Sequence, residues 1–155
     1  MDWYSLVKTL HIVSATVLFG TGIGTAFFMF RSHFTDNIHE KIYATRNTVL
    51  ADYLFTFPSG IIQPLSGVWL IWYVGYDPME YWLLMTYGLY ILAGICWLPV
   101  VWIQIVLKRI LIECEKAGSE IPDRYFKLFR IWFMLGWPAF ISLLGVFYLM
   151  VTKPI

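Results

Sequence analysis

One histidine, His11, stands in the apolar run "LHIVSATVLFGTGIGTAFFMF" at residues 10–30, and Lys8 precedes it by one helical turn. Neutral imidazole is a common ligand of haem iron and other metals, and its titration near neutral pH also suits proton transfer. Ionisable side chains inside a membrane helix are costly and therefore point to function. His11 has three interpretations: an iron or metal ligand, a proton relay, or a structural histidine hydrogen-bonded to Gln63 or a tyrosine.

Other polar residues fall at the depth of His11 if the apolar runs are helices that cross a membrane. With a rise of about 1.5 Å per residue, His11 lies about 12 Å below the end of its helix. The residues expected near that layer are Gln63, Tyr87, Tyr90 and Ser142.

A haem at His11 raises the question of a second axial ligand. No second histidine lies within the apolar runs, and Met85 and Met150 are the methionines expected on the same side. Either thioether could bind the iron, a symmetric dimer could supply His11 twice, or the iron could keep one open position. Lys8 and Gly22 on the face of His11, together with Gln63, complete the predicted cofactor site.

A second polar layer is expected toward the opposite membrane face. Asp52 falls one turn into the second apolar run, and Gln104 lies near the end of the third. An unpaired charge costs about 2.5–3.5 kcal/mol at a helix centre. We therefore expect a structural ion pair between Asp52 and Arg130 or Arg31, with a proton or substrate relay as the alternative.

The glycines of "FGTGIGTAF" do not form a dinucleotide loop, because their spacing is not G-x-G-x-x-G and no strand precedes them. Thr16, Gly20 and Gly24 recur every four residues, as in seams where membrane helices approach closely. That seam lies opposite His11. Gly22 lies on the face of His11 and predicts a small hollow there.

The composition indicates a membrane protein. The 155 residues are 59% hydrophobic and only 14% charged, whereas soluble domains carry about 25% charged residues. The sequence therefore predicts an all-α, polytopic bundle of four transmembrane helices, because a barrel would show short alternating segments. It forms one membrane domain over residues 1–155, with helices near 3–30, 49–74, 81–107 and 131–151.

The orientation follows from the basic residues of the loops. Loops 31–48 and 108–130 are rich in Lys and Arg, whereas 75–80 has Asp77 and Glu80 and no basic residue. We expect both basic loops in the cytoplasm, an N-out/C-out topology and no cleavable signal peptide. His33 and His39 belong to the first loop, where we expect solvated side chains. No basic stripe indicates nucleic acid, and two cysteines are too few for an iron–sulfur site.

The stretches "LVKTLHIVSATVLFGTGIGTAFF", "ADYLFTFPSGIIQPLSG", "GICWLPVVWIQ" and "RIWFMLGWPAF" resemble a bacterial family of small four-helix proteins described only as predicted integral membrane proteins. The resemblance covers most of the chain and extends to copper-resistance D-type proteins and J-type protoporphyrinogen oxidase. The latter has a similar opening stretch with a histidine needed for activity, and it binds b-type haem. The resemblance implies that role for His11 and, less directly, for Lys8. The oxidase's other basic positions, and outer methionine or histidine clusters typical of copper handling, are missing here.

These observations together predict a protein of the bacterial inner membrane that binds haem b through His11. A redox or electron-transfer role follows, as in a haem-dependent membrane oxidoreductase, with quinone or a porphyrin as lipid-soluble partner. A homo-oligomer through the Thr16–Gly20–Gly24 seam is expected unless that seam packs within one bundle. The alternatives are a non-enzymatic accessory or assembly subunit, and a membrane protein that handles a small solute or a metal.

Overall fold

Helices make up nearly all of residues 2–154, the part of the chain that the computed structural model describes. The elements are α1 (Trp3–Ser32), α2 (Ile38–Ala51), the π-helical segment η1 (Asp52–Thr56), α3 (Phe57–Val74), α4 (Tyr81–Ala117) and α5 (Asp123–Thr152). Since α2, η1 and α3 follow without a break, four helical stretches are long and apolar enough to cross a membrane. Residues 2–154 contain no strand, which confirms the predicted all-α, four-span fold class.

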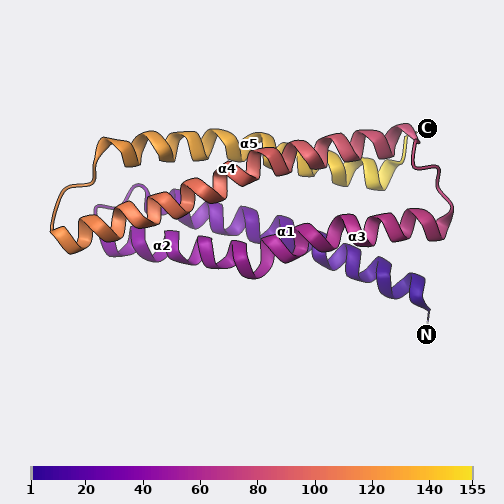
Figure 1. Cartoon of the computed structure of the whole chain (residues 1–155), viewed down its shortest axis with the longest axis horizontal. Helices are drawn as coiled ribbons and strands as arrows, with labels where there is room; N and C mark the ends of the chain where they lie inside the picture. Colours follow the sequence, from indigo (N-terminus) through magenta and orange to yellow (C-terminus); the bar gives the residue numbers. More distant parts are fainter. Residues whose placement is uncertain (1, 155) are drawn as a thin grey trace.

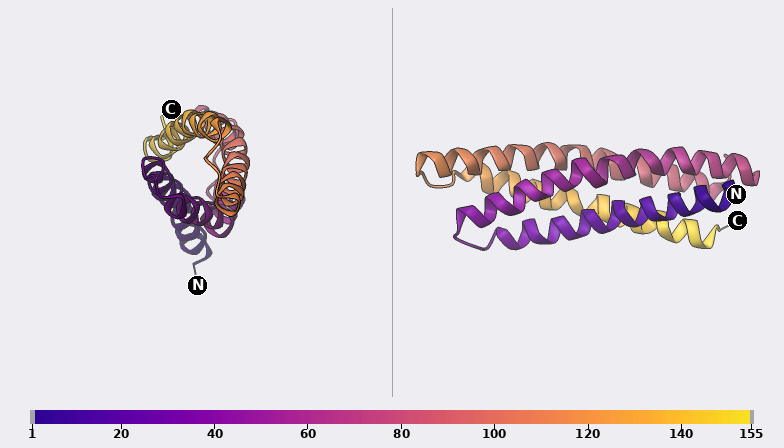
Figure 2. Two further views of the ribbon diagram at one scale, coloured as in Figure 1. Left: turned by 90° about the vertical axis from the view of Figure 1, so that its left-hand side faces the viewer. Right: turned by 90° about the horizontal axis from the view of Figure 1, so that it is seen from below.

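The four spans run roughly along one axis, with both termini at one end of the molecule (Figure 1). We call this the terminal end, and the opposite end, with connections 33–37 and 118–122, the loop end. The most extensive helix packing is between α4 and α5 and between α1 and α3. The end-on view in Figure 2 shows the helices arranged around a ring. The chain is therefore two helical hairpins, joined chiefly by packing of α2 on α4.

Residue types that commonly cap helices lie at the helix ends. Asp2 and Asn37 accept hydrogen bonds from the backbone N–H groups of Tyr4 and His39, at the first turns of α1 and α2. Gly75 and Gly118 end α3 and α4 with φ angles of 79° and 60°, the left-handed conformation that glycine adopts without strain. Local sequence therefore determines where these helices begin and end.

The helices at the loop end are longer than the sequence predicted. The expected loops 31–48 and 108–130 are mostly helical, and only residues 33–37 and 118–122 connect the helices. Helix α4 has 37 residues, about 55 Å of helix, whereas the hydrocarbon core of a bilayer is about 30 Å thick. The predicted ends were wrong because hydropathy falls where charges begin, although Lys, Glu and Arg are themselves good helix formers.

Lys41 closes the C-terminal end of α1, although lysine is rarely buried. Its side chain is 5% exposed, and its Nζ donates to the carbonyl oxygens of Ser32 at 3.1 Å and His33 at 2.7 Å. These are among the carbonyls that a helix C-terminus leaves without a partner, and a cation there also suits the helix dipole. Lys41 thus fixes α2 against the end of α1.

The packed apolar core lies mainly toward the loop end, around Met29, Leu107, Leu111 and Tyr125. A smaller cluster around Trp82, Leu83 and Leu149 lies near the terminal end. Many other large apolar side chains point outward, as shown by exposed fractions of 67% for Leu65, 65% for Leu98 and 83% for Val151. Such a surface suits lipid, because soluble proteins rarely expose large contiguous apolar patches.

A proline in α3 leads to one of the hydrogen bonds that join the two hairpins. Pro64 has no N–H, so the carbonyl of Gly60 four residues earlier loses its helical partner. The hydroxyl of Tyr90 on α4 donates to that carbonyl oxygen at 2.6 Å. A Cβ atom added at Gly60 would lie 3.9 Å from this hydroxyl, an ordinary van der Waals contact, so the hydrogen bond does not itself require glycine. The proline and the tyrosine therefore act as a matched pair.

Substitution Tyr90→Phe should reduce stability by about 1 kcal/mol, because it leaves the Gly60 carbonyl without a partner inside the membrane. The measurement is unfolding in mixed micelles of neutral detergent and dodecyl sulfate. Tyr87→Phe is the matched control, since Tyr87 packs beside the Trp82 cluster and its hydroxyl bonds no group within residues 2–154. Equal losses for the two variants would contradict the pairing of Tyr90 with Pro64.

Candidate functional site

His11 lies half-buried on α1 against the middle of α3. Its Nδ1 atom is 2.7 Å from the hydroxyl oxygen of Ser66, which is itself buried. The ring therefore does not bond to Gln63 or to a tyrosine, as the structural interpretation had expected. It is fixed by a hydroxyl from the facing helix.

The surroundings of Ser66 determine which ring nitrogen of His11 carries the proton. The Ser66 hydroxyl donates to the carbonyl of Ile62 at 2.6 Å and lies 3.2 Å from the carbonyl of Gln63. A hydroxyl has a single proton, and both carbonyls can only accept it. His11 Nδ1 must therefore carry hydrogen and donate to Ser66, which leaves Nε2 with its lone pair. No protein hydrogen bond to Nε2 forms within residues 2–154.

Gln63 holds the same histidine by hydrogen-bonding to the backbone of His11. The side-chain amide of Gln63 donates to the carbonyl of His11 at 2.6 Å and to the hydroxyl of Ser14. Ser14 in turn donates to the His11 carbonyl at 3.1 Å. The level along the helices that was expected from the sequence correctly placed Gln63 beside His11. It missed Ser14 and Ser66, although each lies three residues from a predicted member and thus on the same helical face.

A glycine leaves room beside the imidazole ring. A Cβ atom added at Gly67 would lie 3.4 Å from His11 Cε1, so a side chain there would crowd the ring. Gly22, which the sequence placed on the same face of α1, meets no atom within 4 Å of the equivalent position. Open space is therefore present at Gly22, whereas at Gly67 the imidazole ring itself lies where a side chain would begin.

Two further predicted members of the cofactor site lie apart from this network. Lys8 is exposed, and its Nζ is 5.4 Å from the centroid of the Tyr4 ring, a cation–π contact. Tyr4 itself stacks on Tyr73 of α3. Met85 is 42% exposed on α4, and α4 packs chiefly on α5 and α2, whereas His11 faces α3. The structure thus brings His11, Gln63, Ser14 and Ser66 together, without Lys8 or Met85.

Asp52 forms the second polar cluster, with neutral partners. Its side chain is 4% exposed. The amide of Gln104, oriented to satisfy both neighbours, donates to Asp52 Oδ2 at 2.7 Å and accepts from Trp132 Nε1 at 3.1 Å. This relay connects η1, α4 and α5.

The expected ion pair of Asp52 with Arg130 or Arg31 is not formed within residues 2–154, where the one ion pair joins His39 and Glu115. Arg31 and Arg130 are both exposed. Long basic side chains near helix ends extend toward water. Within residues 2–154, neither arginine therefore pairs with the carboxylate of Asp52, which is buried in the bundle. Gln104, which the sequence had placed only in the same layer, takes the position opposite Asp52.

Asp52 begins a π-helical segment, in which the N–H of Phe57 bonds to the Asp52 carbonyl. Pro58 follows and cannot donate a regular helical hydrogen bond, which explains the irregularity at this point. Within the segment, the hydroxyl of Thr56 is buried and finds no hydrogen-bond partner among residues 2–154. π-helical turns inside α-helices are frequent at functional sites.

Within residues 2–154, no side chain or backbone closely approaches the glycines of the small-residue seam of α1. Thr16 and Gly20 are exposed, and a Cβ atom added at Gly20 or Gly24 would meet nothing within 4 Å. The seam is therefore open to lipid or to another molecule.

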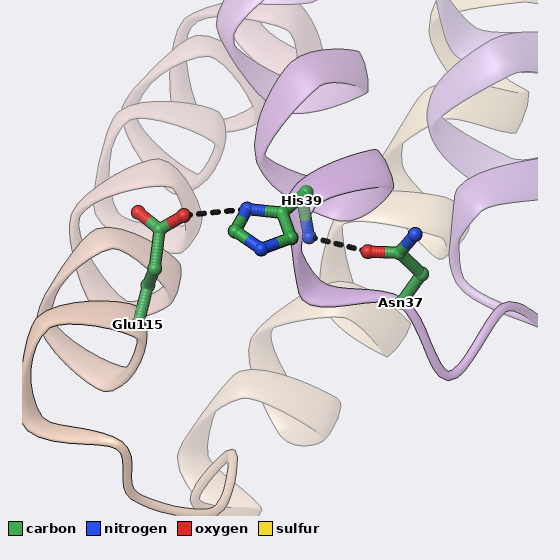
Figure 3. Close-up of polar contacts among 3 residues, drawn as sticks. All are labelled: Asn37, His39 and Glu115. Carbon is green, nitrogen blue, oxygen red and sulfur yellow. Dashed lines mark hydrogen bonds and ion pairs between the residues drawn. The ribbon is translucent and has the colours of Figure 1, made fainter.

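The histidines of the first connection differ in environment. His39 is exposed, and its Nδ1 lies 2.7 Å from Glu115 (Figure 3). His33, expected to be solvated, instead stacks on Phe129 with ring centroids 3.9 Å apart. Its Nδ1 is buried without a partner. Burial, and secondarily the nearby Lys41, lower the pKa of His33 below its ordinary value.

Comparison with known proteins identifies one family. Residues 5–154 match the family described as "Predicted integral membrane protein (DUF2269)". No curated protein and no solved structure gives a significant match. Within residues 2–154, no group of three or more His, Cys, Asp or Glu side chains could hold a metal ion. A haem needs only one or two axial ligands, so a single histidine is sufficient to consider one.

The stability of the protein should fall as the pH decreases from about 7 toward 5. Because the pKa of His33 is lowered in the folded state, the unfolded chain binds this proton more readily, and acid favours unfolding below about pH 6.5. Thermal unfolding in neutral detergent checks this, with an expected decrease of a few degrees. His33→Phe preserves the stack on Phe129 and should flatten the pH dependence; an unchanged dependence would show that another group titrates.

Proposed function

The chain belongs to the family described as Predicted integral membrane protein (DUF2269), and for this member we propose a haem-b-binding protein with a redox or electron-transfer role. The single observation that supports it is the fixed tautomer of His11. The hydroxyl oxygen of Ser66 accepts the hydrogen bond from Nδ1, and Nε2 keeps a lone pair that bonds no group within residues 2–154. Ligating histidines commonly donate their other ring nitrogen to a hydrogen-bond acceptor, which orients the ring.

The residues around His11 fit such a group in three respects. The orientation of the imidazole is fixed from α3, Nε2 bonds no group within residues 2–154, and open space remains at Gly22 on the same face of α1. Gln63 and Ser14 bond the backbone of His11 and so hold the turn of α1 that carries it. A bound haem would supply one-electron chemistry, while these residues orient the ligand and exclude competing hydrogen bonds.

The second coordination position comes from outside the His11 network in this proposal. Met85 lies on α4, away from α3, and Met150 packs against the Trp82 cluster. An open position, or a second His11 from a symmetric dimer, fits better. The Thr16–Gly20–Gly24 seam, in which Thr16 and Gly20 are exposed, supports a homo-oligomer, because small residues at intervals of four let membrane helices approach closely. The seam lies opposite His11, so this contact would leave the second position to an open site or to another interface.

Localisation and partners complete the proposal. The basic residues near the loop end favour a cytoplasmic position for that end by the positive-inside rule, and so an N-out/C-out topology in a bacterial inner membrane. Lipid-soluble electron carriers such as quinones, or a porphyrin, match a site reached from the bilayer. The resemblance of the opening stretch to J-type protoporphyrinogen oxidase, where a histidine is needed for activity, favours the same assignment.

A reduced-minus-oxidised visible spectrum of the protein purified from haem-replete cells tests this proposal. We expect a Soret band that His11→Ala abolishes in a variant that remains folded, because the axial ligand is lost. His39→Ala is the matched control and should retain the band, since His39 is exposed at the loop end.

Ser66→Ala should retain the band and shift the midpoint potential, because it removes the acceptor of the Nδ1 proton and leaves Nε2 in place. A colourless wild-type protein, or a band that survives in His11→Ala, contradicts the proposal. Either result would favour an accessory or assembly subunit.

A second candidate function, proton or small-solute handling, is favoured by Asp52. The carboxyl is buried and accepts a hydrogen bond from the neutral amide of Gln104. In the same π-helical segment, the buried hydroxyl of Thr56 has no hydrogen-bond partner within residues 2–154. A buried carboxyl without a cation is most easily accommodated with a bound proton. Under this candidate, Asp52 takes up and releases that proton during transport.

Infrared difference spectra recorded across a pH step in reconstituted vesicles test the second candidate. The expected result is a carboxyl C=O stretching band that Asp52→Asn removes and Arg130→Gln preserves. Arg130→Gln is informative because that arginine is exposed and forms no ion pair within residues 2–154. Loss of the band in both variants, or its persistence in Asp52→Asn, would exclude Asp52 as the proton carrier.

A further inference from the structure

An open groove of about 710 Å³ lies between α2 and α4 toward the loop end. Ligand sites commonly have volumes of about 300–1,000 Å³. The groove runs from His39 and Glu115 near the helix ends to Leu50 and Tyr53 closer to the middle of the bundle. It is separate from His11, Asp52 and their partners, none of which lines it.

The groove is basic in its middle and meets an acidic hollow at its outer end. Arg46 and Lys108 line its middle, and neither forms an ion pair within residues 2–154. Glu115, the one acidic residue of the lining, is bonded to His39 at 2.7 Å. Figure 3 shows His39 projecting from α2 toward Glu115 on α4. Beyond this pair, a second hollow is lined by Asp36, Glu115 and Glu120 and has no Lys or Arg.

The lining becomes apolar in the direction of the membrane. Lys108 follows the apolar stretch 100–107 of α4, so it marks the level at which that helix leaves the hydrocarbon. On the membrane side of this level the groove is bordered by Val49, Leu50 and Tyr53. Leu50 and Tyr53 are 53% and 58% exposed, so their surface is available to another apolar group.

We propose that this groove binds one anionic phospholipid, with its phosphate between Arg46 and Lys108 and its acyl chains along Leu50 and Tyr53. Two uncompensated cations match a phosphodiester, and the adjoining apolar surface matches the chains. The His39–Glu115 pair closes the groove toward the acidic hollow and keeps the head group on the basic side. Basic pockets between membrane helices at a cytoplasmic face recognise anionic head groups in this way.

Native mass spectrometry of the full chain, released from neutral detergent micelles, measures this binding. Phosphatidylglycerol and phosphatidylcholine are titrated separately. The wild-type protein should bind one phosphatidylglycerol in preference to phosphatidylcholine. Arg46→Gln/Lys108→Gln should weaken that binding about 30-fold, since each basic residue near an anionic surface contributes roughly fivefold. The single variant Lys108→Gln, with an expected fivefold loss, replaces the double variant if the latter does not fold.

Arg124→Gln/Lys127→Gln is the matched control, because it removes two exposed charges from α5 at the same end and outside the groove. It should change binding less than twofold. Three results would overturn the proposal: no head-group preference in the wild-type protein, equal losses in both double variants, or displacement of the lipid by inorganic phosphate at an equal free concentration. The last result would show a simple anion site that makes no use of the acyl chains.

Discussion

The constraint on which this structure depends is that polar atoms within lipid must find their partners in the protein. The carbonyl that Pro64 frees at Gly60 is met by Tyr90, and the carbonyls at the end of α1 are met by Lys41. Without water to substitute, each missing partner costs free energy. Hydrogen bonds from side chains therefore fix particular contacts between helices, while apolar side chains both fill the core and face lipid.

The same constraint gives the two polar clusters their chemical character. At His11, the Ser66 hydroxyl is committed to a carbonyl, so the ring must donate through Nδ1. At Asp52, the partner is an amide held by Trp132, so the carboxyl is hydrogen-bonded without being neutralised. One cluster thus presents a free lone pair, and the other presents a buried acid. Ligand binding suits the first, and proton exchange suits the second.

The two clusters and the groove lie at successive levels of one bundle. His11 is near the terminal end, Asp52 lies at the break between α2 and α3, and the basic groove lies beside α2 and α4. Helices α2 and α4 take part in more than one of these, since Gln104 bonds Asp52 and Lys108 lines the groove one turn later. The polar positions of α4 are therefore spaced along a single long helix.

The sequence by itself determined the number of spans, their all-helical nature, and the shared level of His11 and Gln63, because hydropathy and helical rise depend on one chain segment at a time. It did not determine which side chains from different helices bond to one another. Ser66 replaced Gln63 at the imidazole, Gln104 replaced the arginines at Asp52, and the Thr16–Gly20–Gly24 seam turned outward. Each of these depends on how a helix is rotated about its axis and which neighbour it meets. Only the packing of all four spans fixes that rotation. The periodicity of a sequence shows which residues share one face of a helix, but it does not show which residues of another helix that face contacts.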